Sequence, residues 1–135
     1  MLFTSRTLLS LVSLAVFATP GLGQQLQLNC TAGAAAFNCA SFVPSFCSSM
    51  GNITTINGNS TYSGCFAGPG PNQSCVLTAL STISSPFAVN VTNCASALNA
   101  VSAVCPMGGV GMFTAAIFKF AIDPNNGACA IPIGN

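Results

Sequence analysis

Eight cysteines in a chain of only 135 residues constrain its fold more than any other feature. They are Cys30, Cys39, Cys47, Cys65, Cys75, Cys94, Cys105 and Cys129. An even number of cysteines in a small secreted chain indicates a disulfide framework, here of four bridges. Zinc is the weaker interpretation, because the sequence has no histidine and no two cysteines have the close spacing of zinc sites. Many pairings fit the spacing, so the connectivity stays open.

The N-terminal residues support secretion. Arg6 precedes an apolar run over 8–18, which is followed by a Pro-Gly pair and small residues up to Gly23. These are the three zones of a secretory signal peptide. A membrane anchor would need roughly 20 apolar residues, and this run is shorter. We therefore expect residues 1–23 to be a cleaved signal peptide and residues 24–135 to be one secreted, extracellular domain without a membrane span.

Charge is almost absent from the expected mature chain. Removal of the signal peptide leaves only Lys119 and Asp123 as charged side chains. One cation cannot neutralise several phosphates, so we expect neither nucleic acid nor an anionic membrane surface as a partner. Hydroxyl and amide side chains, together with N-linked glycans, must then hydrate the surface and keep the protein in solution. The sequence predicts glycosylation at Asn52, Asn59, Asn72 and Asn90. A fifth sequon, at Asn29, has a cysteine in its middle position and is the weakest.

Side chains for catalysis are scarce. The chain lacks histidine and glutamate, and Asp123 is its single acidic residue. A glycosidase carboxylate pair, a Ser-His-Asp triad and a Cys-His pair are therefore excluded within one chain. We interpret Lys119 and Asp123 as a solvated pair near a turn. The glycines over 108–111 lack the lysine and spacing of a phosphate-binding loop and form a connector. The sequence predicts a protein that is not an enzyme and has no cofactor or metal.

The first half of the mature chain predicts a helix and a hairpin. Apolar residues from Cys39 to Met50 follow helical spacing, which places a helix near 41–50. Ser41 is the expected N-cap, Pro44 falls in the first turn and Gly51 ends the helix. Strands are expected over 61–66 and 74–80, joined by a loop rich in proline and glycine.

The second half repeats this order. A helix is expected to begin after Thr92 as N-cap and to end at Pro106. A long strand over 110–122 follows, with Lys119 and Asp123 on one face, then a turn over 123–127 and a return strand over 128–131. We therefore expect an α+β fold: a small, disulfide-stapled single domain with an antiparallel β-sheet of about four strands covered by two helices.

Four stretches of the chain resemble the small fungal, mushroom glycan-binding proteins of the Y-three-like lectin family. They are residues 42–47, the hairpin from Cys65 to Cys75, residues 93–109 and residues 126–135. The resemblance rests on cysteine order and on the junction over 105–109. It implies a single α/β domain with four disulfides that binds a carbohydrate or glycoprotein without cleaving it, and it allows a homodimer.

Glycan sites combine an apolar or aromatic platform with a few hydrogen-bonding groups. Tryptophan is absent and Tyr62 is the only tyrosine. Asn57, Asn59 and Thr61 are the polar residues near it, and these four form the predicted glycan-binding group. In the alternative interpretation, Tyr62 packs within the hairpin and the asparagines serve turns or carry glycans.

Two other classes of secreted protein compete with a lectin. A cysteine-rich toxin or effector of the killer-toxin type would share the helix-and-sheet build, but such toxins act through exposed basic residues and this chain keeps one lysine. A hydrophobin-like surface protein would share eight cysteines and high apolar content. Hydrophobins need adjacent cysteine pairs, which this sequence lacks.

Overall fold

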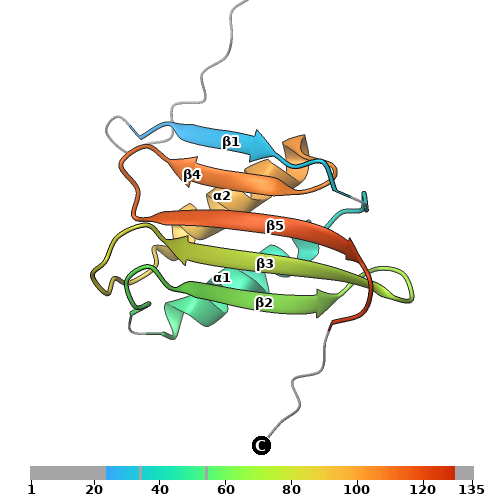
Figure 1. Cartoon of the computed structure of the whole chain (residues 1–135), viewed down its shortest axis with the longest axis horizontal. Helices are drawn as coiled ribbons and strands as arrows, with labels where there is room; N and C mark the ends of the chain where they lie inside the picture. The colour runs from blue at the N-terminus through green and yellow to red at the C-terminus, as the bar shows by residue number, and fades with distance from the viewer. Residues whose placement is uncertain (1–23, 34, 54, 130–135) are drawn as a thin grey trace, which may run out of the picture.

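The domain has two layers, a five-stranded antiparallel sheet and two α-helices that lie together on one of its faces (Figure 1). The computed structural model describes residues 24–33, 35–53 and 55–129. The expected signal peptide over 1–23 lies outside these residues. Within them, neither helix combines the length and apolar character that crossing a membrane requires.

The elements, in chain order, are β1 (Leu26–Cys30), the 3-10 helix η1 (Ala40–Phe42), α1 (Val43–Gly51), β2 (Thr61–Ala67), β3 (Gln73–Ser81), α2 (Val91–Val104), β4 (Gly109–Phe113) and β5 (Phe118–Asn126). The strand order is β1-β4-β5-β3-β2, and each neighbouring pair is antiparallel. The chain crosses the sheet twice, once through α1 between β1 and β2 and once through α2 between β3 and β4. The predicted α+β class and the β2–β3 hairpin are confirmed.

The sheet has five strands where about four were expected, because β1 forms from the glutamine-rich segment at the start of the expected mature chain. Leu26 and Leu28 are half-buried and alternate with exposed Gln27 and Asn29, as in a strand with one buried face. The partner of β1 is β4, far along the chain. Two alternating leucines are too weak a local pattern to predict a strand, and β1 forms because it pairs with β4.

The single strand expected over 110–122 is wrong, because the chain turns between Phe113 and Phe118. Ala115 has left-handed backbone angles (φ 60°), and the N–H of Ala116 donates to the carbonyl of Phe113 at 3.0 Å. The buried residues of β4 are odd-numbered and those of β5 are even-numbered. One continuous strand would keep its buried residues at the same parity. The change of parity therefore requires a break between β4 and β5, and the two strands form a hairpin.

The turn expected over 123–127 is also wrong, because β5 continues to Asn126. Pro124 is tolerated there because the pairing with β4 already ends at Ile122, so Pro124 has a strand partner, Cys75 of β3, on one side only. β5 thus pairs with β4 and β3 rather than with a return strand over 128–131. Residues 128 and 129 are not in a strand, and 130 and 131 lie outside the described residues.

Both predicted helices form, but their expected N-caps are wrong. Ser41 lies in η1, and the Oδ1 of Asn38 accepts the N–H of Ala40 at 2.7 Å instead. The N-cap of α2 is Asn90, whose Oδ1 accepts the N–H of Asn93 at 3.0 Å, two residues before the expected Thr92. Asparagine is as good an N-cap as threonine, so the apolar periodicity did not distinguish them.

The four expected disulfides all form, and each one joins segments that are distant in sequence. The pairs are Cys30–Cys105, Cys39–Cys75, Cys47–Cys94 and Cys65–Cys129. Cys47–Cys94 links α1 to α2 inside the core, where Phe46, Leu77 and Leu98 are fully buried.

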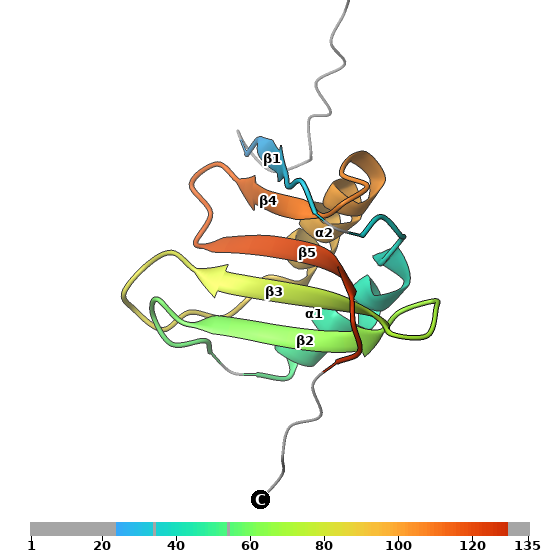
Figure 2. The same ribbon diagram turned by 45° about the vertical axis from the view of Figure 1, so that its right-hand side comes forward.

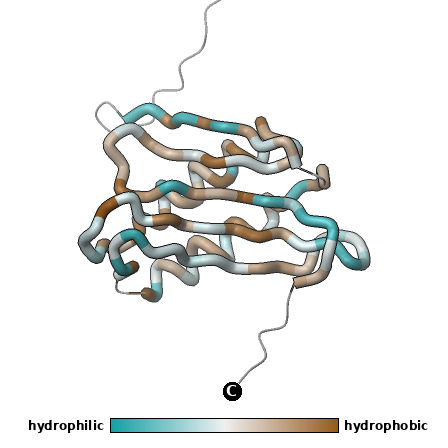
Figure 3. Tube along the Cα trace, viewed as in Figure 1, coloured by the Kyte–Doolittle hydropathy of each residue, from teal (hydrophilic) through white to brown (hydrophobic). Residues whose placement is uncertain are grey.

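Among the residues that the structure describes, no helix covers the other face of the sheet, as the view in Figure 2 also shows. Thr78, Ala121 and Val110 lie across three neighbouring strands on this uncovered face. Figure 3 shows hydrophilic residues on β1 and near the C-terminal end of β5. Lys119 and Asp123 are both exposed and share this face, as predicted, although they lie within β5 rather than at a turn.

Candidate functional site

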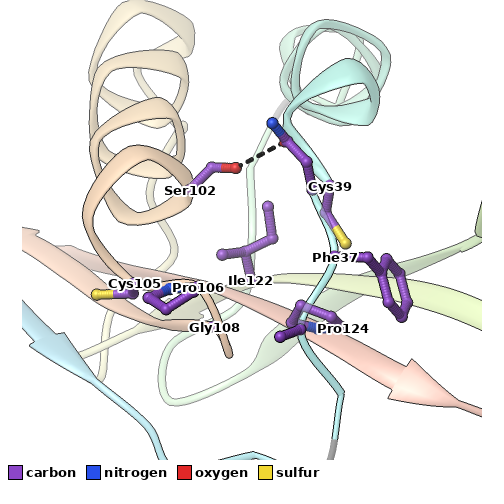
Figure 4. Close-up of a pocket in the computed structure, with 10 residues that line it drawn as sticks. Phe37, Cys39, Ser102, Cys105, Pro106, Gly108, Ile122 and Pro124 are labelled. Atoms are coloured by element: carbon purple, nitrogen blue, oxygen red, sulfur yellow. Dashed lines mark hydrogen bonds between the residues drawn. The ribbon is translucent and has the colours of Figure 1, made fainter.

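A pocket of about 220 Å³ lies on the helix side of the sheet, where the C-terminal end of α2 approaches β5 and the segment before η1 (Figure 4). We call it the α2–β5 pocket. Its lining residues are Ala36, Phe37, Asn38, Cys39, Ser102, Cys105, Pro106, Gly108, Ile122 and Pro124.

Apolar side chains form much of the pocket wall, and three of them, Phe37, Pro106 and Pro124, are rings. Phe37 is half-buried, and Figure 4 places it and Pro106 on different sides of the pocket, with Ile122 and Pro124 between them. Ile122 and Pro124 reach the pocket because they occupy alternate positions of β5, on the face turned toward the helices. The wall therefore offers flat surfaces on which an apolar face of a ligand can lie.

Two neutral polar side chains stand at the rim. The Oγ of Ser102 on α2 donates to the Oδ1 of Asn38 at 3.1 Å, shown as the dashed line in Figure 4. The same Oδ1 accepts the backbone N–H of Ala40 at 2.7 Å. Both bonds use the oxygen of Asn38, so its Nδ2 group can donate to a ligand, and the hydroxyl oxygen of Ser102 can accept from one.

Two disulfides hold the walls in place. Cys39, bonded to Cys75 on β3, and Cys105, bonded to Cys30 on β1, are both lining residues. Gly108, which follows α2, has a left-handed backbone (φ 92°). A pocket whose walls are cross-linked before the ligand arrives loses less conformational entropy on binding.

The pocket contains no side chain that titrates. Its two cysteines are in disulfides, and its remaining lining residues are apolar, amide, hydroxyl or glycine residues. Asp123 points to the uncovered face because it alternates with Ile122 and Pro124 along β5. There the Nδ2 of Asn125 donates to its Oδ2 at 3.2 Å. The arrangement can bind a neutral ligand, and it holds no general acid or base.

A wider groove of about 440 Å³ lies on the uncovered face, along the start of β4 and the end of β5. Thr31, Asp123 and Asn125 supply its polar groups, and Val110 and Ala121 lie on its floor. It has no aromatic lining residue, so it offers hydrogen bonds without a platform.

The structure separates two members of the predicted glycan-binding group. Tyr62 is half-buried on the helix face of β2, where its ring lies 5.8 Å from that of Phe46 and its hydroxyl lies 3.4 Å from the Oγ of Ser49. Its neighbour Thr61 is exposed on the opposite face. The two side chains therefore do not converge on one ligand.

The other two predicted residues lie on the turn before β2. Asn57 and Asn59 are exposed, and Asn59 has left-handed backbone angles (φ 56°) with its N–H donated to the carbonyl of Ile83 at 2.8 Å. Both thus serve the turn. A role of Asn57, Asn59, Thr61 and Tyr62 in glycan binding stays a prediction.

Sequence reasoning missed Phe37, Asn38 and Ser102. The available signal was local: Phe37 and Asn38 directly precede Cys39, and Pro106 directly follows Cys105. Only the pairing of these cysteines and the α2–β5 packing bring the two groups together, and neither could be read from spacing.

Two comparisons with known proteins identify relatives of this chain. A sequence model described as "Glycan binding domain Y3" matches residues 38–129, a range that includes all four strands from β2 onward and both α-helices. The antiviral protein CAP of Coprinus comatus is 34% identical over 96 residues, which cover 68% of this chain and 91% of that protein. The predicted resemblance to fungal, lectin-like proteins is thereby confirmed. The chain belongs to the Y3 family of glycan-binding domains.

Proposed function

We propose that the chain is a secreted, non-enzymatic lectin that binds a terminal sugar of a glycan or glycoprotein in the α2–β5 pocket. One observation carries the site: Phe37, Pro106 and Pro124 form apolar walls beside the polar groups of Asn38 and Ser102. A sugar ring has apolar C–H faces and a rim of hydroxyls, so it needs this combination of surfaces. The size of the pocket suits one ring rather than a long chain.

The bound glycan would not be cleaved. Hydrolysis of a glycosidic bond needs two carboxyl groups, one on each side of the bond. The chain has one acidic residue, Asp123, and its side chain lies on the other face of the sheet. Family membership likewise supports a binding role.

Secretion is supported by the four disulfides, since such bonds persist in oxidising compartments. We expect the secreted protein to begin at Gln24, after cleavage at Gly23. N-terminal sequencing of the protein from a culture medium tests this, and an intact start at Met1 would contradict it.

Filling the pocket tests the site with little disturbance of the core. Ala36 is exposed at the rim, so Ala36→Trp should block the pocket and lower affinity for array-identified glycans at least about tenfold, or 1.4 kcal/mol. Ala103→Trp, at a position on α2 that is also exposed but lies outside the lining, is the matched control and should bind normally.

Two further variants test the other surfaces that could bind the glycan. Asp123→Asn tests the groove on the uncovered face, and Asn57→Ala tests the turn that the sequence singled out. If either variant abolishes binding while Ala36→Trp retains it, the α2–β5 pocket is not the glycan site.

A second role, in antagonism toward other organisms, is favoured by the name of the antiviral relative. We propose that such an effect would act through glycan binding. Growth or infection assays with the wild type and Ala36→Trp test this, because an effect that survives in the variant would indicate the toxin-like alternative instead.

A further inference from the structure

A second pocket, of about 210 Å³, lies at the other end of α2, away from the α2–β5 pocket. We call it the Phe87 pocket; Phe113, Ala115, Ile117 and Phe118 line it together with Phe87, and Asn90 and Asn93 stand at its edge. Phe113 and Phe118 are buried and belong to the core. Phe87 is different, since 46% of its surface is exposed.

The exposed position of Phe87 is fixed by the backbone. Its N–H and C=O both bond to Ile56, at 3.0 and 2.9 Å, in an isolated antiparallel bridge. This bridge anchors the loop before α2 and leaves the aromatic ring at the surface. A large apolar ring in water is unfavourable, so a cover over it would be stabilising.

Asn90 lies three residues after Phe87 and starts the sequon Asn90-Val91-Thr92. Asn90 and Thr92 are both exposed, and Asn90 lines the pocket itself. Its Oδ1 is the N-cap of α2 and accepts the N–H of Asn93 at 3.0 Å. N-glycosylation modifies Nδ2 and keeps Oδ1 as an acceptor, so the cap and the sugar are compatible.

The other predicted acceptors lack this arrangement. Ser49, Ile56 and Pro69 stand three residues before Asn52, Asn59 and Asn72, so none of these sequons follows an aromatic residue at that spacing. Asn59 and Asn72 are exposed on tight turns, with left-handed backbone angles of φ 56° and 58°. A glycan on either would extend from the tip of a turn into solvent.

We propose that Asn90 is an N-glycosylation site whose first N-acetylglucosamine covers the Phe87 ring and fills the mouth of the Phe87 pocket. The apolar face of the sugar would rest on the aromatic ring, and its hydroxyls would remain in water. The glycan thus acts as a covalently held part of the fold rather than as a solubilising attachment alone. This inference rests on the proposed secretion but not on the glycan-binding site.

The modification forms a bond between Nδ2 of Asn90 and the anomeric carbon of the sugar. The donor is an oligosaccharide on a polyprenyl diphosphate, supplied by the secretory pathway. The bond from the anomeric carbon to the diphosphate breaks, the diphosphate leaves with the electron pair, and one proton of Nδ2 passes to a base of the transferase. No oxidation or reduction is involved.

Peptide mass spectrometry of the full chain, secreted from a fungal host, tests the occupancy of Asn90. Chymotrypsin is the suitable protease, because the expected mature chain has a single lysine. Trimming with endoglycosidase H leaves one sugar as a mass tag on each occupied asparagine. We expect this tag on Asn90, and its absence there overturns the proposal whatever the other sequons carry.

Thermal unfolding tests the contact with Phe87. Relative to Thr92→Ala, which removes the sequon and keeps the cap, the trimmed protein should unfold about 4 °C higher. In a Phe87→Leu background, which keeps an apolar side chain, most of this increment should disappear. An equal increment in both backgrounds would overturn the proposed contact.

Asn72→Gly is the matched control, since it removes a turn sequon at a position where glycine suits the backbone. Its effect should be the same with Phe87 and with Leu. Glycan-array binding by Thr92→Ala should equal that of the wild type, so failure here and failure of the α2–β5 site are distinguishable.

Discussion

Gly108 shows how one backbone position limits the sequence. It has φ 92°, and a Cβ there would collide with the carbonyl of Ile122 and lie 2.9 Å from the Cδ of Pro124. We expect Gly108→Ala to lower the free energy of unfolding by about 3 kcal/mol, measured by chemical denaturation. Gly127→Ala also adds a side chain at positive φ (144°) but meets open space, so its loss should be clearly smaller. Equal losses would mean that backbone strain alone, without the collision, explains the effect.

At the scale of one element, the N-cap of α2 gives a test of the corrected helix start. Asn90→Ala should destabilise the protein by about 1 kcal/mol because the N–H of Asn93 loses its acceptor. Thr92→Ala should change the free energy of unfolding by less than half of that. The measurement needs protein from a bacterial periplasm, where disulfides form without N-glycans. A larger loss for Thr92→Ala would favour the cap first expected from the sequence.

The elements also show what could be predicted. The α1 helix and the β2–β3 hairpin depend on nearby residues, such as Pro44 in a first turn and the glycines and prolines over 68–71, so local patterns placed their ends within two residues. Sequence reasoning missed the β4–β5 hairpin because its turn depends on the left-handed backbone of Ala115, and it missed β1 because that strand depends on long-range pairing with β4. The candidate site was missed for the same reason, since Phe37 and Ser102 meet only after Cys39 and Cys105 have found partners on β3 and β1.

For the whole molecule, the four disulfides should differ in their resistance to reduction. Cys47–Cys94 is buried between the helices, while Cys65 is exposed on β2 and Cys129 is half-buried in the segment after β5. Because exchange requires access to the sulfur, Cys65–Cys129 should be the first bridge cleaved by a mild thiol. Differential alkylation followed by mass spectrometry measures the order. Earlier cleavage of Cys47–Cys94 would show that the core opens more readily than the sheet edge.

The neutral lining of the α2–β5 pocket decides how the protein should behave on a glycan affinity column. In the proposed complex no ion pair would hold the glycan, so a higher ionic strength should not weaken binding in the pocket, and mildly acidic or alkaline buffers should change no charge there. We expect the bound protein to stay on the column through a salt gradient and a pH step and to elute only with free competing sugar. Elution by salt alone would point to Lys119 or Asp123, on the uncovered face, as part of the contact. A lectin whose glycan affinity does not depend on salt or pH would bind the same glycans in rainwater, in soil and in the fluids of another organism.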